Sequence, residues 1–320
     1  MKYRKLGRTS IEVSEIGYGA WGLANSSWLD GNDEKIQRSV DKAVELGVNF
    51  FDTALTYGNG VGEVRLAHFL RHHPHVNVAT KIPTVNRKFN PIGCEFDSMY
   101  SKEHIINCTK KSLQNLNRDH IDLQQLHVWT DEWLKDDEWY EAIDYLKNEG
   151  LIRFFGVSVQ AHQPESVINL VKSGLVDVVQ VIYNIFDQTP ENTLFPLCEK
   201  HNVGVVVRVA LDEGGLTNKI TPESSFPEDD FRFHYFRGDR KVEVFNRVQR
   251  IARELEIDPQ ILPEIALKFV LSNPVVSSVI PGMRNIEHVE KNVRVSNGVY
   301  LIEKELEILS NHQWFRNFYE

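Results

Sequence analysis

The stretch Val48-Asn49-Phe50-Phe51-Asp52-Thr53-Ala54-Leu55-Thr56-Tyr57-Gly58 places a short apolar run directly before a group of polar side chains. Similar runs recur along the chain, and segments with helical periodicity separate them. The predicted strands cover residues 15–19, 48–51, 76–79, 121–126, 153–157, 176–182, 203–207 and 275–280. Eight strand-helix units at this spacing predict parallel strands joined by right-handed crossovers. The count favours an α/β fold of the (β/α)8 TIM-barrel class over an open doubly wound sheet.

Three segments lie outside this repeat. Residues 5–16 alternate apolar and polar side chains around a Gly7-Arg8-Thr9-Ser10 turn, which predicts an N-terminal β-hairpin. Residues 300–314 have the periodicity of an extra C-terminal helix, packed on the barrel exterior or across its end. Residues 211–240 form a long aromatic-rich connection that either closes over a ligand or packs on the barrel. Since no linker divides the chain, we expect a single barrel domain over residues 1–320.

Composition excludes several classes of function. Thirty-six Lys and Arg against 45 Asp and Glu give a net charge of −9, which disfavours nucleic acid and anionic membranes as partners. No stretch is long and apolar enough to predict a membrane span or a signal peptide. The three cysteines form no C-x-x-C pair, and His68 and His72 lack a third ligand, so we expect no metal site. A cytoplasmic protein is the resulting prediction.

Polar residues that follow three successive predicted strands identify a candidate active site. Asp52 and Tyr57 follow the strand at 48–51, Lys81 follows the strand at 76–79, and His127 follows the strand at 121–126. Active sites of (β/α)8 barrels lie at the carboxyl ends of the strands, so these four side chains are expected to converge on one rim.

The four residue types suit proton transfer to a carbonyl oxygen. An ammonium beside a phenol stabilises the phenolate, so Lys81 is expected to lower the pKa of Tyr57. Asp52 would pair with Lys81, and His127 would donate a hydrogen bond to the substrate oxygen. The alternative is an ordinary Asp52–Lys81 ion pair between strand ends, with Tyr57 and His127 lining a pocket passively.

The chain resembles the aldo-keto reductases from the hairpin to about residue 292. The matching motifs are Phe51-Asp52-Thr53-Ala54 with Tyr57-Gly58, Ala79-Thr80-Lys81, Leu126-His127, Gly156-Val157-Ser158, Gln180 with Tyr183-Asn184, Gly214 to Lys219, and Ile280-Pro281-Gly282-Met283-Arg284. The resemblance implies a barrel that binds NADPH, with NADH possible, and reduces aldehydes or ketones without a metal. It also implies that Tyr57 is the general acid, with the other three residues in the roles given above.

The resemblance further implies a set of cofactor-binding residues. Ser158 and Gln180 match positions that hold the nicotinamide carboxamide, although Val159 stands where many members have Asn. Arg208 stands where many members stack an aromatic ring on the nicotinamide, and its guanidinium can also stack. The region of Leu211, Gly214 and Lys219 would lie against the pyrophosphate.

The adenosine 2′-phosphate is assigned by the resemblance to the segment that opens the last barrel helix. Arg284 is the best candidate for this phosphate because a guanidinium can bind it with two hydrogen bonds. Gly282, His288 and Asn292 complete the group, with His288 where Gln is common. A solvated basic helix face is the alternative.

Substrate contacts are expected from Trp21, Trp28 and Trp129, which follow two of the strands, although such aromatics can also be simple packing. We therefore expect an NADPH-dependent reductase of a small carbonyl substrate. The alternatives are an NAD(P)-dependent sugar or polyol dehydrogenase, a slow cofactor-sensing binding subunit, and an aldolase that uses Lys81 as a Schiff-base amine, which pairing with Asp52 disfavours. The sequence does not predict the substrate or the oligomeric state.

Overall fold

The computed structural model describes residues 1–24 and 33–319. Its main sheet has eight parallel strands in the order β10-β9-β8-β7-β6-β5-β4-β3. These are β3 (Tyr18–Gly19), β4 (Phe50–Asp52), β5 (Asn77–Ile82), β6 (Ile121–Leu126), β7 (Ile152–Ser158), β8 (Val178–Ile182), β9 (Gly204–Arg208) and β10 (Val276–Val279). Parallel bridges from Ile16 to Val279 and from Gly19 to Gly282 join the first strand to the last. The predicted (β/α)8 barrel is therefore confirmed.

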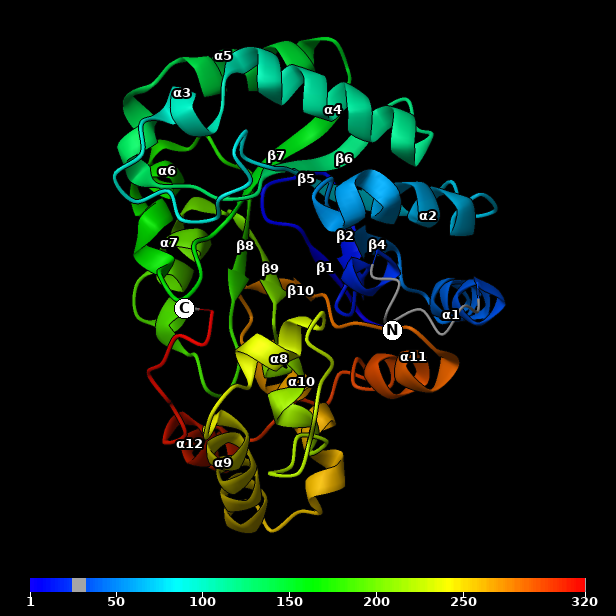
Figure 1. Cartoon of the computed structure of the whole chain (residues 1–320), viewed down its shortest axis with the longest axis vertical. Coiled ribbons are helices and arrows are strands. Elements are labelled where there is room, and N and C mark those ends of the chain that lie inside the picture. Colours follow the sequence, from blue (N-terminus) through cyan, green and yellow to red (C-terminus); the bar gives the residue numbers. More distant parts are fainter. Residues whose placement is uncertain (25–32, 320) are drawn as a thin grey trace.

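Helices alternate with the strands and surround the barrel (Figure 1). They are α1 (Asp33–Glu45), α2 (Val61–Phe69), α3 (Phe96–Met99), α4 (Lys102–Leu116), α5 (Glu138–Asn148), α6 (Ile168–Ser173), α7 (Leu194–His201), α9 (Arg240–Glu254), α10 (Leu262–Ser272) and α11 (Ile286–Val293). Helix α1 buries Ile36, Val40 and Ala43, which recur at helical spacing, while its other face is charged. The helices thus cover the outer face of a sheet whose strands are almost wholly buried.

The N-terminal hairpin closes the floor of the barrel, as its alternating pattern predicts. Strand β1 (Tyr3–Lys5) pairs with the antiparallel strand β2 (Glu12–Ser14). A compact apolar cluster joins its buried side chains to those of five barrel strands: Leu6, Ile11, Val13, Phe50, Ala79, Leu123, Val178 and Val206. Gly7 has a φ of 55°, and a Cβ there would collide with the backbone of Gly204. Only glycine fits the hairpin this closely against the floor.

Arg4 connects this floor to the end of α10 and the start of β10. Its guanidinium donates to the backbone carbonyls of Leu271, Asn273 and Val276, at 2.7, 3.1 and 2.7 Å. It also pairs with the buried carboxylate of Glu15, with 2.7 Å between Nε and Oε1. These four acceptors take four of the five N–H donors of the planar guanidinium.

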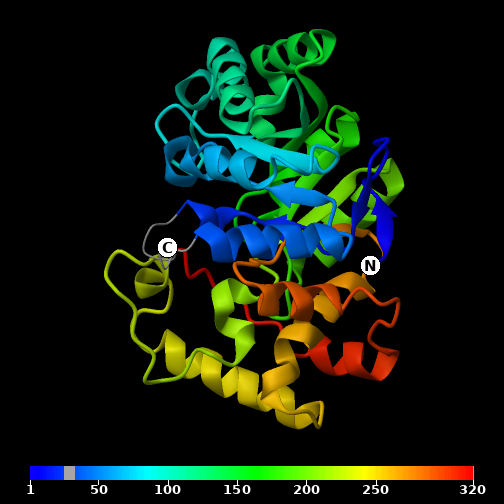
Figure 2. The same cartoon turned by 90° about the vertical axis from the view of Figure 1, so that its right-hand side faces the viewer.

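The two irregular segments differ from their predictions in opposite directions: the loop contains more regular structure and the C-terminal segment less. The predicted loop at 211–240 holds a 3-10 helix, η7 (Asp212–Thr217), and the short helix α8 (Phe231–Tyr235). The predicted C-terminal helix is α12 (Glu303–Ser310), shorter than expected. The chain then runs back as a tail to the barrel mouth, at the end opposite the hairpin (Figure 2). No helix in the described ranges is long and apolar enough to cross a membrane.

Candidate active site

The ion pair of Asp52 and Lys81 forms the base of the site. Asp52 ends β4 and Lys81 lies near the end of the neighbouring strand β5. Lys81 Nζ lies 2.5 Å from Asp52 Oδ1 and donates to the carbonyl of Thr53 at 2.8 Å. Both side chains are at most 3% exposed. Separating the two side chains would leave two unpaired buried charges, which is costly in free energy. The pair is therefore fixed in position.

Two glutamine side chains complete the surroundings of the Asp52 carboxylate. Gln180 of β8 donates to Asp52 Oδ2 at 2.8 Å, and Gln125 of β6 lies 3.4 Å from the same oxygen. Register places Ser158, the last residue of β7, beside Gln180. Ser158 and Gln180 are therefore adjacent, as expected of two residues that bind the same carboxamide. In the structure the amide of Gln180 orients Asp52, and its contact with a carboxamide stays a prediction.

Tyr57 is held by a left-handed turn that follows β4. Gly58 and Gly60 have φ of 57° and 93°, and Asn59 between them has 55°. The positive φ favours glycine at position 58, and a Cβ there would also make a tight contact of 3.1 Å with the carbonyl of Ala24. The turn directs the phenol over Lys81, whose Nζ lies 5.3 Å from the ring centre. This cation-π contact couples the phenol to the ion pair.

The Tyr57 phenol is protonated at neutral pH. Burial raises its pKa, the charges of Lys81 and Arg208 lower it, and Asp52 raises it, with a net increase from the ordinary value. Lys81 thus acts in the expected direction, but the expected net lowering of the Tyr57 pKa is wrong because burial outweighs the ammonium. A protonated phenol is the form that a general acid requires.

His127 is a neutral imidazole. It follows β6, and burial together with the charges of Lys81 and Arg208 holds its pKa well below the ordinary value. Its Nδ1 lies 3.3 Å from the hydroxyl of Thr56, and its ring meets Tyr57 edge-on at 6.1 Å. With Nδ1 accepting from Thr56, the other ring nitrogen carries the proton and is free to donate.

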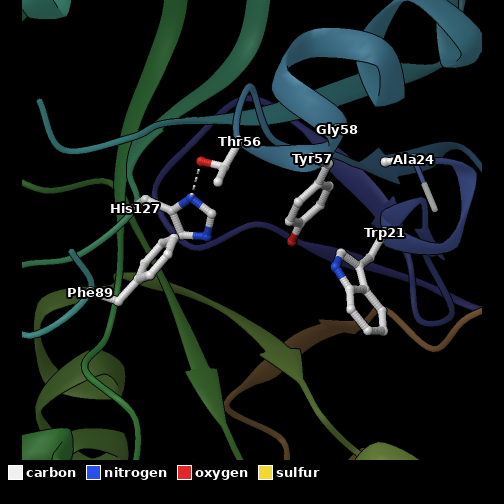
Figure 3. A pocket seen from close by; sticks show the side chains of 7 residues that line it. All are labelled: Trp21, Ala24, Thr56, Tyr57, Gly58, Phe89 and His127. Atoms are coloured by element: carbon white, nitrogen blue, oxygen red, sulfur yellow. Dashed lines mark hydrogen bonds between the residues drawn. The ribbon is translucent and has the colours of Figure 1, made fainter. Parts of the chain in front are cut away.

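Tyr57 and His127 face a pocket of about 430 Å³ (Figure 3). Its remaining lining consists of Trp21, Ala24, Thr56, Gly58 and Phe89. The tyrosine hydroxyl and the Trp21 indole point into this space, and the Phe89 ring lies 5.0 Å from His127. The pocket therefore combines two polar hydrogen-bond donors with apolar walls, a composition suited to a small carbonyl compound.

The three tryptophans expected at the pocket have different positions. Trp21 lines it. The expectation for Trp129 is wrong: its ring is fully buried, packs against Trp133 and Trp139 at 5.9 and 5.1 Å, and donates to Asp131. Trp28 lies outside the described residues. Sequence reasoning missed Phe89 and Thr56; Thr56 was detectable beside Tyr57, whereas the Phe89 loop carries no local signal.

Arg208 ends β9 at the same rim. It is half-buried, donates to the carbonyl of Val159 at 3.2 Å, and has a buried Nε without a partner in the described part of the chain. The next residue, Val209, has a φ of 58°, which a β-branched residue rarely adopts. Asn184 holds that conformation by donating to the Val209 carbonyl at 2.9 Å. Backbone strain and an unsatisfied donor thus lie together at this rim, and contact of Arg208 with the cofactor stays a prediction.

The loop after β9 has free space beside the backbone of Gly214. Leu211 precedes η7 and is half-buried, and Gly214 has a φ of 102° with no atom within 4 Å of where its Cβ would be. Lys219 is exposed just beyond η7. These are the three positions expected at a pyrophosphate, and the open backbone of Gly214 is compatible with close approach of such a group.

The start of α11 gathers the residues expected at a phosphate. Asn285 caps the helix by accepting from the His288 amide at 2.8 Å. Burial and the charges of Lys219 and Arg284 lower the pKa of His288, so these basic groups lie near one another. Gly282 is exposed with open space beside it, and Asn292 lies 3.5 Å from its carbonyl. A helix N-terminus flanked by cations is suited to an anion.

Comparisons with known proteins agree with this geometry. The sequence model of the aldo/keto reductase family matches residues 15–313. The chain is 32% identical to the uncharacterized oxidoreductase YqkF of Bacillus subtilis, over 98% of this chain and 96% of YqkF. It is 29% identical to the NADH-specific methylglyoxal reductase of Escherichia coli, covering 93% and 94%. The holo form of aldo-keto reductase AKR11C1 from Bacillus halodurans superposes with a TM-score of 0.77 at 28% identity, covering all of both chains.

Proposed function

The chain belongs to the aldo/keto reductase family, and on this premise we propose that it reduces aldehydes or ketones to alcohols with NADPH as hydride donor and Tyr57 as proton donor. One observation supports the proposal most directly. The hydroxyl of Tyr57 and the neutral imidazole of His127 face one pocket, and the Asp52–Lys81 ion pair lies behind the phenol.

The chain's own groups account for the proton and for the orientation of the substrate. His127 donates from Nε2 to the carbonyl oxygen, which holds that oxygen within reach of the Tyr57 hydroxyl. As negative charge develops on the oxygen, Tyr57 Oη gives up its proton, and Lys81 stabilises the phenolate that results. Asp52 keeps Lys81 in place, while the rings of Trp21 and Phe89 limit access of water.

The nicotinamide cofactor fits the residues at the rim. Ser158, Gln180 and Arg208 would hold the nicotinamide end, the backbone near Leu211 and Gly214 together with Lys219 the pyrophosphate, and Gly282, Arg284, His288 and Asn292 the adenosine phosphate. When bound, the nicotinamide cofactor would supply the hydride that the carbonyl carbon accepts. We favour NADPH over NADH because the basic groups at the start of α11 match a second phosphate.

Two measurements test the proposal. Calorimetric titration with NADPH and NADH should give binding of both, with NADPH the tighter. A panel of small aldehydes, ketones and the matching alcohols, followed at the nicotinamide absorbance, should then show faster reduction than oxidation. Faster oxidation of a polyol would favour the dehydrogenase alternative. Cofactor binding without turnover of any of these compounds would contradict the enzyme proposal and favour the binding subunit.

A further inference from the structure

We propose that Arg316 and Tyr319 of the C-terminal tail are positioning residues for the cofactor: in the loop that faces the pyrophosphate, Arg316 neutralises Asp212 and Tyr319 donates a hydrogen bond to Glu213. The inference rests on the proposed function, because it takes the cofactor to lie against this loop. Unlike the residues at the pocket, the tail residues would act through the loop, without contact with substrate.

Asp212 is a buried acid whose charge partner comes from the tail. Arg316 Nη2 lies 2.5 Å from Asp212 Oδ1, and the side chains are 7% and 2% exposed. Tyr235 of α8 donates to the same oxygen at 3.0 Å. Asp212 Oδ2 has no partner in the described part of the chain, and a Cβ at Gly215 would collide with it. The carboxylate therefore depends on Arg316 for compensation of its charge.

Glu213 is bound by the next segment of the tail. Tyr319 donates its hydroxyl to Glu213 Oε1 at 2.7 Å. The Tyr319 ring stacks on Phe231 of α8 at 5.9 Å, and Phe231 in turn meets the pocket residue Trp21 edge-on at 5.9 Å. Asp212 and Glu213 have φ of 52° and 53°, a left-handed conformation that Glu rarely adopts and that Asp adopts more readily. The tail thus holds a strained segment of the loop at both of its acids.

The guanidinium of Arg316 is itself fixed by aromatic rings of the tail. Its Cζ lies 4.4 Å from the ring centre of Trp314 and 4.1 Å from that of Phe318. The Trp314 amide donates to the carbonyl of Phe186, at 2.9 Å, which joins the tail to the barrel. An Arg held in this way keeps its charge and loses little freedom when it pairs.

Charge balance explains why a cofactor-facing loop can contain two acids. A pyrophosphate is anionic, and a neighbouring carboxylate would repel it in proportion to its unbalanced charge. Arg316 cancels the charge of Asp212, and Tyr319 accommodates Glu213 with a hydrogen bond. Without Arg316, Asp212 must either stay charged and repel the cofactor or take up a proton. The first outcome dominates at high pH and the second at low pH.

Other titratable groups lie near Asp212 and Glu213, and they must be considered when the pH of the test is chosen. The groups that influence Asp212 or Glu213 are His162, Arg208, Arg232, Tyr235, Arg316 and Tyr319. Each variant is therefore compared with the wild-type protein at the same pH.

The experiment measures the Kd for NADPH by calorimetry at pH 8 and pH 6 in the full-length protein. Arg316→Met should weaken binding at pH 8 at least about fivefold, the lower end of typical coupling between sites, and the loss should shrink at pH 6. The double variant Asp212→Asn/Arg316→Met should recover wild-type affinity at both values. Because the tail is outside the pocket, kcat at saturating NADPH should not change.

A matched control is Arg247→Met. Arg247 Cζ lies 4.0 Å from the Trp314 ring, but its ion-pair partner is Glu243 of the same helix, so this variant should bind NADPH as the wild type does. If Arg316→Met does not fold, Tyr319→Phe with its hydroxyl removed should still weaken binding at pH 8.

Three outcomes would overturn the inference. Unchanged Kd in both Arg316→Met and Tyr319→Phe would show that the tail does not affect the cofactor. A double variant as weak as Arg316→Met at both pH values would assign the loss to packing instead of charge. If the wild-type protein binds neither NADPH nor NADH, the proposed function is refuted together with this inference, before any variant is compared.

Discussion

Lys81 serves two partners at once: its Nζ lies 2.5 Å from Asp52 Oδ1 and 5.3 Å from the centre of the Tyr57 ring. The first contact secures the ammonium charge in a buried site. The second places that charge beside the phenol that, in the proposed reaction, carries a negative charge after proton transfer. Stability and chemistry therefore depend on the same group, and substitutions around it should separate the two effects.

Tyr57→Phe tests the proton donor. The variant keeps the ring and its contact with Lys81 but lacks the hydroxyl, so carbonyl reduction should fall on the order of 10²–10⁴-fold, the usual contribution of a general acid. NADPH binding should be unaffected because the ring is retained. Steady-state rates and calorimetric Kd values measure the two parts, and turnover close to the wild-type rate would exclude Tyr57 as the acid.

Lys81→Met tests the buried pair. Removing the cation leaves Asp52 buried without its partner, which should lower the free energy of unfolding by about 3–5 kcal/mol. The Tyr57 pKa should rise further, because Lys81 lowers it, so alcohol oxidation should require a higher pH. Urea unfolding of Lys81→Met and of Asp52→Asn/Lys81→Met gives the check: the double variant should regain most of the stability, and no recovery would mean that the loss is not electrostatic.

His127→Gln tests the neutral imidazole through the pH dependence of stability. The folded protein keeps His127 unprotonated, whereas the unfolded chain protonates it near pH 6.5. Below pH 6.5 unfolding therefore takes up a proton. The stability that the neutral His127 contributes is fully present above that pH and is lost as the pH falls below it. When the pH falls from 7.5 to 5.5, the free energy of unfolding measured with urea should drop by about 1 kcal/mol more in the wild type than in His127→Gln. Equal losses would assign a charged imidazole to the folded state.

Arg284→Ala tests the choice between the two nicotinamide cofactors. Loss of a charge-assisted contact to the 2′-phosphate should weaken NADPH roughly 10-fold or more and leave NADH almost unchanged. Lys291→Ala on the same helix is the control, since Lys291 is paired with Glu287 at 2.6 Å and exposed. Equal losses for both cofactors in Arg284→Ala would remove the phosphate assignment.

Arg208→Tyr tests the proposed position of Arg208 beside the nicotinamide. A guanidinium at that position would disfavour the cationic ring of NADP+ more than the neutral ring of NADPH. The tyrosine variant should therefore bind NADP+ more tightly relative to NADPH. Fluorescence titration with each form gives the ratio of Kd values, and an unchanged ratio would refute the electrostatic role.

The sequence predicts the rim residues well because they share one rule. Asp52, Lys81 and His127 each lie at or just beyond the carboxyl end of a strand, and the ends of parallel strands meet at one edge wherever the helices lie. Trp129 also follows a strand, yet it turns outward into the packing of Trp133. Whether a residue past the strand end faces the pocket depends on loop geometry, which local pattern does not contain.

Two other results depend on distances that a sequence does not give. Burial and the Lys81 charge act on the Tyr57 pKa in opposite directions, so the sign of the sum follows only from the packed site. Arg316 and Asp212 are separated by 104 residues and lie on segments without regular periodicity. Their pairing depends on where the tail returns to the barrel, and no motif marks it.

The hairpin floor has a consequence for protein engineering. Arg4 and Glu15 reinforce the barrel at the end opposite the reacting groups, and their partners are backbone carbonyls and buried side chains of the last strand-helix unit. Substitutions at that end can therefore be screened for thermal tolerance at a distance from the pocket residues Tyr57 and His127, where the usual trade against activity is smallest.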